Sequence, residues 1–194
     1  MIVIDNALPK TVFNEIVKIV TDWDNFPYYF SPYTAYDDGL NKMNFSYSHV
    51  FVSEGKSTSF SSNYFLAAVH SCIDLTEHKL DYVDRIRLGM ILSNNNSLEN
   101  EAHVDNNIPH KTGLLYLNDS DGDTIFYDTK YDPRSEFAAS EYGRKQEMRE
   151  VQRITPKANK LVIFDGLTYH ASSKPVNSPY RLVLNFNFIE SYNF

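Results

Sequence analysis

Residues 160–170, KLVIFDGLTYH, carry the pattern that decides the fold. The apolar run 161–164 is typical of a buried strand. Asp165 and Gly166 then form a turn signal, in which Asp165 is expected to act as a turn former. His170 follows this turn directly, so it is expected near the end of a strand, where binding residues are often found.

Several further segments predict strands, because they are short, rich in branched and aromatic residues, and separated by Gly, Asn, Asp or Pro. They are 1–8, 45–52, 84–93, 111–119, 122–128 and 180–190. Apolar residues at three- and four-residue spacing predict a helix after Pro9 and a second one over 62–77. Their inward residues are expected to be Val12, Phe13, Ile16, Val17 and Val20 in the first, and Phe65, Ala68, Val69, Cys72 and Ile73 in the second.

Two segments are less regular. The aromatic segment 25–39 predicts irregular structure, and the charged segment 136–156 predicts a mobile loop that ends in a strand. A substrate lid is expected in 26–36 or in 132–149, because long loops often carry function. Helices followed by strands indicate a sandwich or barrel with helices on one outer face.

Composition restricts the function. The chain has 194 residues, 42% of them hydrophobic, and a net charge of -7. These values predict one folded domain over 1–194 and argue against a nucleic-acid partner. A single cysteine, Cys72, suggests a reducing compartment and a buried packing residue. The chain shows neither a signal-peptide pattern nor a membrane-length apolar run, so we expect a cytoplasmic protein.

The segment 101–107, EAHVDNN, holds the candidate metal ligands His103 and Asp105. In an extended segment, side chains two positions apart point to the same side, so both could reach one ion. With His170 they would form two nitrogens and one carboxylate, which is the facial triad of non-heme Fe(II) oxygenases. The spacing alone favours a solvated loop containing an Asp turn, and His170 alone would more often be a packed or hydrogen-bonded histidine.

Arg181 begins the last predicted strand, where a guanidinium is costly to bury unless an anion pairs with it. A carboxylate suits its planar fork. The partner could be a bound acid or a structural one such as Asp165 or Glu190. Tyr116 by itself is compatible with an ordinary core aromatic, and His110 is expected on an exposed loop.

The ordered set HVD, LLYLND, DGDTIFYD, PKANKLVIFDGLTYHASSKPV and YRLVLNF resembles the Fe(II)- and 2-oxoglutarate-dependent dioxygenases, especially the prolyl 4-hydroxylase-like group. The resemblance spans about 87–189. It implies a double-stranded β-helix, a cupin-like jelly-roll core over about 85–190, with the helices and strands of residues 1–84 packed on one sheet. Where many relatives have two adjacent glycines this chain has Gly122-Asp123, and where several have a tyrosine it has Ser93.

The resemblance implies that His103, Asp105 and His170 bind Fe(II) and that Arg181, assisted by Tyr116, holds 2-oxoglutarate. It implies O2-dependent hydroxylation of a C–H bond with release of succinate and CO2, and ascorbate as a possible further cofactor. The expected substrate is a peptide or protein residue or a free amino acid. Two alternatives stay open: a cupin-like iron dioxygenase without a keto acid, and a non-enzymatic jelly-roll that binds a ligand or a partner.

Overall fold

The computed structural model describes residues 1–34, 45–94 and 99–191. Its first half contains β1 (Ile2–Ile4), α1 (Lys10–Val20), β2 (Tyr29–Ser31), β3 (Ser46–Ser53), β4 (Lys56–Ser57), α2 (Ser62–Ile73) and β5 (Leu80–Leu92). Its second half contains β6 (Lys111–Tyr116), β7 (Thr124–Lys130), α3 (Ala139–Arg144), β8 (Glu150–Ile154), β9 (Leu161–Asp165), β10 (Thr168–Ser172) and β11 (Tyr180–Glu190).

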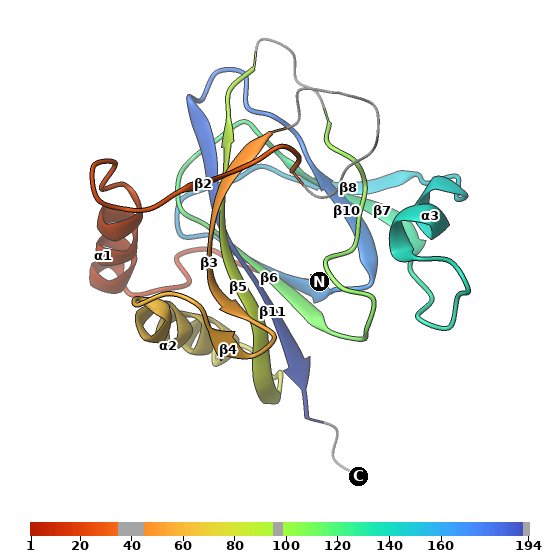
Figure 1. The fold of residues 1–194 in the computed structure, drawn as a ribbon, viewed down its shortest axis with the longest axis horizontal. Helices are drawn as coiled ribbons and strands as arrows, with labels where there is room; N and C mark the ends of the chain where they lie inside the picture. Colours follow the sequence, from red (N-terminus) through yellow and green to blue (C-terminus); the bar gives the residue numbers. More distant parts are fainter. Residues whose placement is uncertain (35–44, 95–98, 192–194) are drawn as a thin grey trace.

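The strands form two antiparallel sheets that face each other (Figure 1). The larger has the order β1-β9-β6-β11-β5-β3-β2, with β4 paired to β3, and the smaller has the order β10-β7-β8. Helices α1 and α2 cover the outer face of the larger sheet, while α3 lies beside the smaller one. The predicted fold, mainly β with two facing sheets and N-terminal helices on one of them, is confirmed.

The two-residue period of β11 explains how one sheet serves both a core and a site. Successive side chains of a strand point to opposite faces. On one face, Leu182, Leu184, Phe186 and Phe188 join the hydrophobic core formed with α1 and α2. On the other, Val183 packs between the two sheets, and its neighbours on that face include Arg181 and Asn185.

Both predicted helices are confirmed, with the expected residues inside. Phe13, Ile16 and Val20 of α1 are buried, and Val12 and Val17 pack partly against the same core. In α2 the buried apolar residues are the predicted ones, Phe65, Ala68, Val69, Cys72 and Ile73. Burial of the Cys72 thiol raises its pKa to about 12, as desolvation of a thiolate should.

Two expectations need correction. The segment 25–39 is not wholly irregular, because residues 29–31 form β2 at the edge of the larger sheet; residues 35–39 lie outside the described residues. The charged segment 136–156 does not begin as a plain loop, because residues 139–144 form α3, although its end is the predicted strand β8.

Residues 1–84 contribute strands to the larger sheet as well as helices to its outer face. Strand β1 pairs with β9, and β3 pairs with β5. The N-terminal residues and the jelly-roll strands therefore share one continuous sheet.

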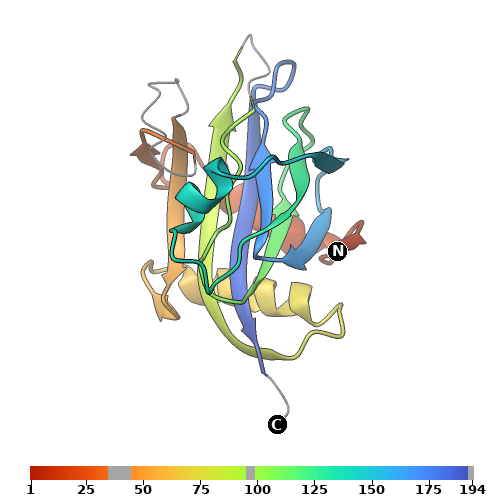
Figure 2. The ribbon, with the colours of Figure 1, turned by 90° about the vertical axis from the view of Figure 1, so that its right-hand side faces the viewer.

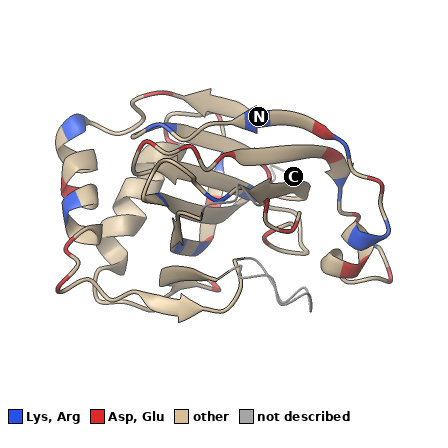
Figure 3. Ribbon diagram, turned by 90° about the horizontal axis from the view of Figure 1, so that it is seen from above, with Lys and Arg blue, Asp and Glu red and all other residues tan. Residues whose placement is uncertain are grey.

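Basic and acidic positions are interspersed over the described chain, without a continuous basic band (Figure 3). No helix among the described residues is both long enough and apolar enough to cross a membrane.

A stacked aromatic pair joins α2 to the larger sheet and predicts a stability effect. The rings of Phe51 and Phe65 lie 3.7 Å apart at their centroids, with an interplanar angle of 16°, and both residues are fully buried. Phe65→Ala should therefore lower the free energy of unfolding by about 3–5 kcal/mol. Phe60→Ala is the control, because Phe60 is 92% exposed, and should change it by less than about 0.5 kcal/mol. Urea unfolding measures both, and equal effects would contradict this packing.

Candidate active site

His103 and His170 are brought together by the backbone, although 67 positions separate them in the sequence. An isolated antiparallel bridge joins them: each backbone N–H donates to the other residue's carbonyl oxygen at 2.9 Å. Residues directly opposite in such a bridge direct their side chains to the same side. The two imidazole rings accordingly lie 4.6 Å apart between centroids.

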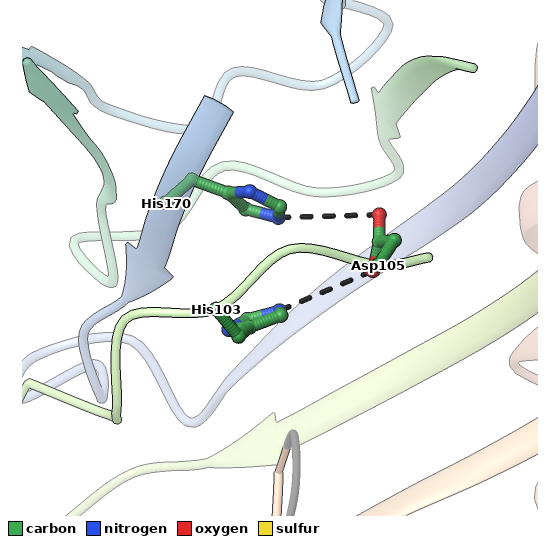
Figure 4. A group of neighbouring side chains, drawn as sticks. All are labelled: His103, Asp105 and His170. Atoms are coloured by element: carbon green, nitrogen blue, oxygen red, sulfur yellow. Dashed lines mark ion pairs between the residues drawn. The ribbon is translucent and has the colours of Figure 1, made fainter. Parts of the chain in front are cut away.

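Asp105 completes the cluster from the loop that follows β5 (Figure 4). One of its carboxylate oxygens lies 4.0 Å from Nε2 of His103, and the other lies 4.0 Å from Nε2 of His170. One ligand atom from each of the three residues lies within 4.8 Å of the others. The structure therefore brings together the three residues that the sequence proposed as metal ligands.

Hydrogen bonds set the orientation of both imidazoles. Nδ1 of His103 lies 3.0 Å from the Glu101 carbonyl oxygen, and Nδ1 of His170 lies 3.1 Å from that of Thr168. Since a carbonyl only accepts, each Nδ1 carries the proton and each Nε2 keeps its lone pair. Burial lowers the pKa of His103, and it lowers that of His170 to about 4, with help from His103. Both rings are therefore neutral at pH 7 and able to coordinate a metal.

Asp105 remains ionised despite its burial. Burial alone would raise its pKa, but the Arg85 guanidinium and the two imidazoles hold it well below its usual range. Arg85 Nη2 donates to one carboxylate oxygen at 2.8 Å. The other oxygen accepts hydrogen bonds from the side chains of Thr112, Asn185 and Asn187 at 3.1–3.2 Å. These donors fix the carboxylate while leaving it facing the histidines.

These four supporting residues were missed from the sequence, but a signal for three of them exists. In β11, Asn185 and Asn187 share the parity of Arg181, so strand alternation places all three on one face. Polar residues recurring on the inner face of a buried strand indicate a polar site there. On β5, Ile86 and Leu88 are buried and face the helices, so strand alternation places Arg85 on the opposite face, toward the site.

Arg181 is 7% exposed and lines a cavity with His103, Asp105 and His170. Its Nη2 donates to the Thr124 hydroxyl at 2.7 Å, and the Tyr116 hydroxyl lies 2.7 Å from the same oxygen. Burial lowers the pKa of Arg181 and raises that of Tyr116. Among the described residues, Arg181 Nε is buried without a hydrogen-bond partner, and no carboxylate forms an ion pair with this guanidinium. An anion entering the cavity would satisfy it.

The candidate structural partners of Arg181 are engaged elsewhere. Asp165 pairs with Lys130 at 2.7 Å and accepts the Leu167 N–H, which confirms its expected turn role. Glu190 contacts His78 and Lys111. The acid that Arg181 requires is therefore not one of these two.

Gly122 shows why this turn needs a glycine beside Arg181. A side chain there would place Cβ 2.8 Å from the Ser173 carbonyl oxygen and 3.1 Å from Cδ of Arg181. The turn that precedes β7 thus approaches Arg181 too closely for any side chain. The neighbouring Asp123 donates its N–H to the Ser173 hydroxyl.

One residue, His110, lies elsewhere than expected. His110 was predicted on an exposed loop, but it is 6% exposed and packs over Gly166, where a Cβ would lie 2.1 Å from its Nε2. A lone histidine in a polar context gives no sequence sign of such packing. Ser93 lies beyond the end of β5 and is exposed; the residues of β5 that line the cavity are Arg87, Gly89 and Ile91.

A second cavity of about 240 Å³ adjoins the first and shares Arg87, His103 and Asp105 with it. Arg85 and residues 138–140, at the start of α3, also line it. Figure 2 shows α3 in front of the sheets, and Ala139 and Ser140 at its start line this cavity. Thr34 lines the first cavity, so both segments expected to hold a lid border the site.

The donor set fits a ferrous ion. Two neutral imidazoles and one carboxylate form the facial triad, which leaves coordination positions open. The Nε of Arg181, in the same cavity, fits the carboxylate of an organic co-substrate. Iron and a keto acid would therefore both find matching groups among residues of this chain.

No protein-family model and no curated protein matches the sequence. Solved structures do match. An oxidoreductase of the 2OG-Fe(II) oxygenase family from Burkholderia pseudomallei has a TM-score of 0.68 and 12% identity, over 99% of this chain and 85% of that one. A prolyl hydroxylase from Trichoplax adhaerens, in complex with a hypoxia inducible factor peptide, has a TM-score of 0.60 and 14% identity, over 97% and 83%.

The geometry predicts a metal site that depends on His103. His103→Ala should weaken binding of Fe(II), measured anaerobically by calorimetry, by more than about a hundredfold, since loss of a supporting residue alone costs about 10–100-fold. His78→Ala is the matched control, because His78 pairs with Glu190 outside the site and should leave affinity unchanged. Equal Fe(II) affinity of His103→Ala and the unmodified protein would rule out this assignment.

The α-ketoglutarate-dependent carbocyclase SnoK from nogalamycin biosynthesis also matches, with a TM-score of 0.63 and 11% identity, over 97% of this chain and 79% of that one. These matches cover the N-terminal half as well, for which the sequence shows no specific resemblance. At this identity they establish the fold. The chain thus has the fold of the 2-oxoglutarate-Fe(II) oxygenases.

Proposed function

We propose that the protein is an Fe(II)- and 2-oxoglutarate-dependent dioxygenase that hydroxylates a C–H bond, in the manner of the prolyl 4-hydroxylases. One observation carries the proposal: two neutral histidines and an ionised aspartate share a cavity with a buried arginine whose Nε lacks a partner among the described residues. The substrate would be a peptide or protein residue or a free amino acid.

Bound iron would supply the oxygen chemistry, in which one oxygen atom of O2 enters the new hydroxyl group and the other enters succinate, with CO2 released from 2-oxoglutarate. The protein's own residues would bind the iron, fix the orientation of its ligands and supply the negative charge beside it. His103 and His170 would donate Nε2 lone pairs, held by their Nδ1 hydrogen bonds. Asp105 would supply the anionic ligand, and its presence favours hydroxylation, because halogenating proteins of this type lack that carboxylate.

Arg181 would hold the distal carboxylate of 2-oxoglutarate through its free Nε. In β11, Arg181 lies four residues from Asn185, whose side chain bonds Asp105. Four strand residues span about 13 Å, and the arginine side chain shortens that gap. A five-carbon keto acid could then bind the metal at one end and Arg181 at the other.

Tyr116 and Thr124 would keep the guanidinium in place. The Thr124 hydroxyl contacts both Arg181 and Tyr116, so the three side chains form one hydrogen-bonded chain. The Tyr116 hydroxyl is neutral, because burial raises its pKa, and it can donate or accept. Tyr116 would act both through the threonine and by direct contact, because the Arg181 guanidinium lies 5.7 Å from the centroid of its ring.

The structural neighbours support the proposal at the level of chemistry. Two of the three are described as oxygenases or hydroxylases, and the third as α-ketoglutarate dependent. The prolyl hydroxylase with its bound peptide supports a peptide substrate, whereas the carbocyclase from nogalamycin biosynthesis shows that the fold also accepts other reactions.

Turnover of 2-oxoglutarate is the primary test. Purified protein with Fe(II), O2 and 2-oxoglutarate should form succinate even without a substrate, at a slow uncoupled rate, as measured by proton NMR. Omitting Fe(II), or replacing His170 by Ala, should abolish succinate formation because the ligand set is incomplete. If the iron-loaded protein neither binds nor consumes 2-oxoglutarate, the proposal fails.

Arg181→Gln tests the co-substrate site separately. Removing the buried guanidinium should raise the dissociation constant for 2-oxoglutarate about thirtyfold or more, since losing one partner of a buried charge pair costs about 2 kcal/mol or more. Fe(II) affinity should stay the same, because Arg181 bonds Thr124 and is not one of the three ligands. Arg153→Gln, in the ion-pair network with Glu99 and Glu150, is the control. Unchanged 2-oxoglutarate affinity in Arg181→Gln would refute its role.

A further inference from the structure

Two arginines of β5 face the metal ligands, but only one of them has a carboxylate partner among the described residues. Arg85 donates to Asp105 at 2.8 Å and is thereby occupied. Arg87 forms no ion pair with any described carboxylate, and its hydrogen bond is a long one, 3.5 Å from Nη1 to the Thr34 carbonyl oxygen. The nearest carboxylate that acts on Arg87, that of Asp105, is already paired with Arg85, so a further anion would stabilise this half-buried guanidinium.

The position of Arg87 relates it to the metal ligands and to the open cavity. In the sheet Arg87 lies directly opposite Asn185, whose side chain bonds Asp105, whereas Arg181 lies opposite Ile91. Arg87 is therefore level with the ligand cluster, about 13 Å along the strand from the level of Arg181. It lines both cavities, at the place where they share His103 and Asp105.

The chemistry of the second cavity fits a small acid. It is lined by Arg85, Arg87 and residues of the segment 103–107, together with the small residues Ala138, Ala139 and Ser140. Its volume of about 240 Å³ falls below the range of about 300–1,000 Å³ typical of sites for drug-sized ligands. A planar guanidinium in such a cavity matches a carboxylate in two-point contact.

We propose that this second cavity is the substrate site and that Arg87 binds a carboxylate of a small substrate of amino-acid size. This inference rests on the proposed function and narrows its substrate class from peptides toward free carboxylic acids. Arg87 is a specificity-determining residue: by anchoring the carboxylate level with the ligand cluster, it would hold a nearby C–H bond beside the metal. Arg181 would then serve the co-substrate and Arg87 the substrate.

The test compares free acids with their amides. The twenty L-amino acids, each as the free acid and as the C-terminal amide, are added to the Fe(II) protein with 2-oxoglutarate, and the stimulation of succinate formation above the uncoupled rate is measured. At least one free acid should stimulate, and its amide should stimulate about tenfold less or worse, as expected when a hydrogen-bonded charge is lost. The proposal is overturned if the amides stimulate as strongly as the free acids, if only blocked peptides stimulate, or if no free acid stimulates.

A second measurement does not depend on turnover. Saturation-transfer NMR with Zn(II)-loaded protein and 2-oxoglutarate should detect binding of the stimulating acid, and Arg87→Gln should weaken that binding about tenfold or more. Arg87→Lys should retain some of it, because the charge remains. Arg153→Gln, whose guanidinium is in a surface ion-pair network, should bind the acid normally.

The variants also separate this inference from the proposed function. If the unmodified protein forms no succinate at all, the proposed function fails before any acid is added. If it does, Arg87→Gln should keep the 2-oxoglutarate affinity within about twofold of the unmodified protein, unlike Arg181→Gln. A loss of 2-oxoglutarate affinity in Arg87→Gln as large as in Arg181→Gln would assign Arg87 to the co-substrate and overturn the inference.

Discussion

The ionised state of Asp105 is the constraint on which the site depends. A carboxylate removed from water costs several kcal/mol unless charges and hydrogen bonds replace the lost hydration. Here Arg85 supplies the charge, and Thr112, Asn185 and Asn187 supply further donors from β6 and β11. Three neighbouring strands of the larger sheet, β5, β6 and β11, thus each donate hydrogen bonds to the Asp105 carboxylate. Because those strands also carry the helix-facing core, the ligand geometry is coupled to the stability of the whole sheet.

The division of each strand into two faces allows this coupling. On β11 the helix-facing residues are apolar, and the site-facing residues include Arg181, Asn185 and Asn187. The helices α1 and α2 bury one face fully, so the other face can carry polar groups without exposing the core to water. The bridge between His103 and His170 then joins the ligand loop to the smaller sheet. A loop that would otherwise be free is held by two backbone hydrogen bonds.

Sequence patterns predicted what depends on period and spacing. The helix faces around Phe13 and Phe65 and the strand around Val162 follow from local periodicity, and all are found in the structure. The convergence of His103, Asp105 and His170 was expected from an ordered set of motifs rather than from any one of them. The packing of His110 over Gly166 and the pairing of Arg85 with Asp105 could not be predicted, because they depend on contacts between distant segments that no local pattern encodes.

Arg87 and Arg181, which have no ion-pair partner among the described carboxylates, restrict the class of substrate and co-substrate more than the fold does. The matched structures with this fold include both a prolyl hydroxylase and a carbocyclase. What distinguishes one reaction from another must then lie in the side chains around the cluster. Arg85 is neutralised by Asp105, so Arg87 and Arg181 are the cations of the cavities left without a described carboxylate. Two separated positive charges match two separate acids, and a keto acid co-substrate accounts for only one of them.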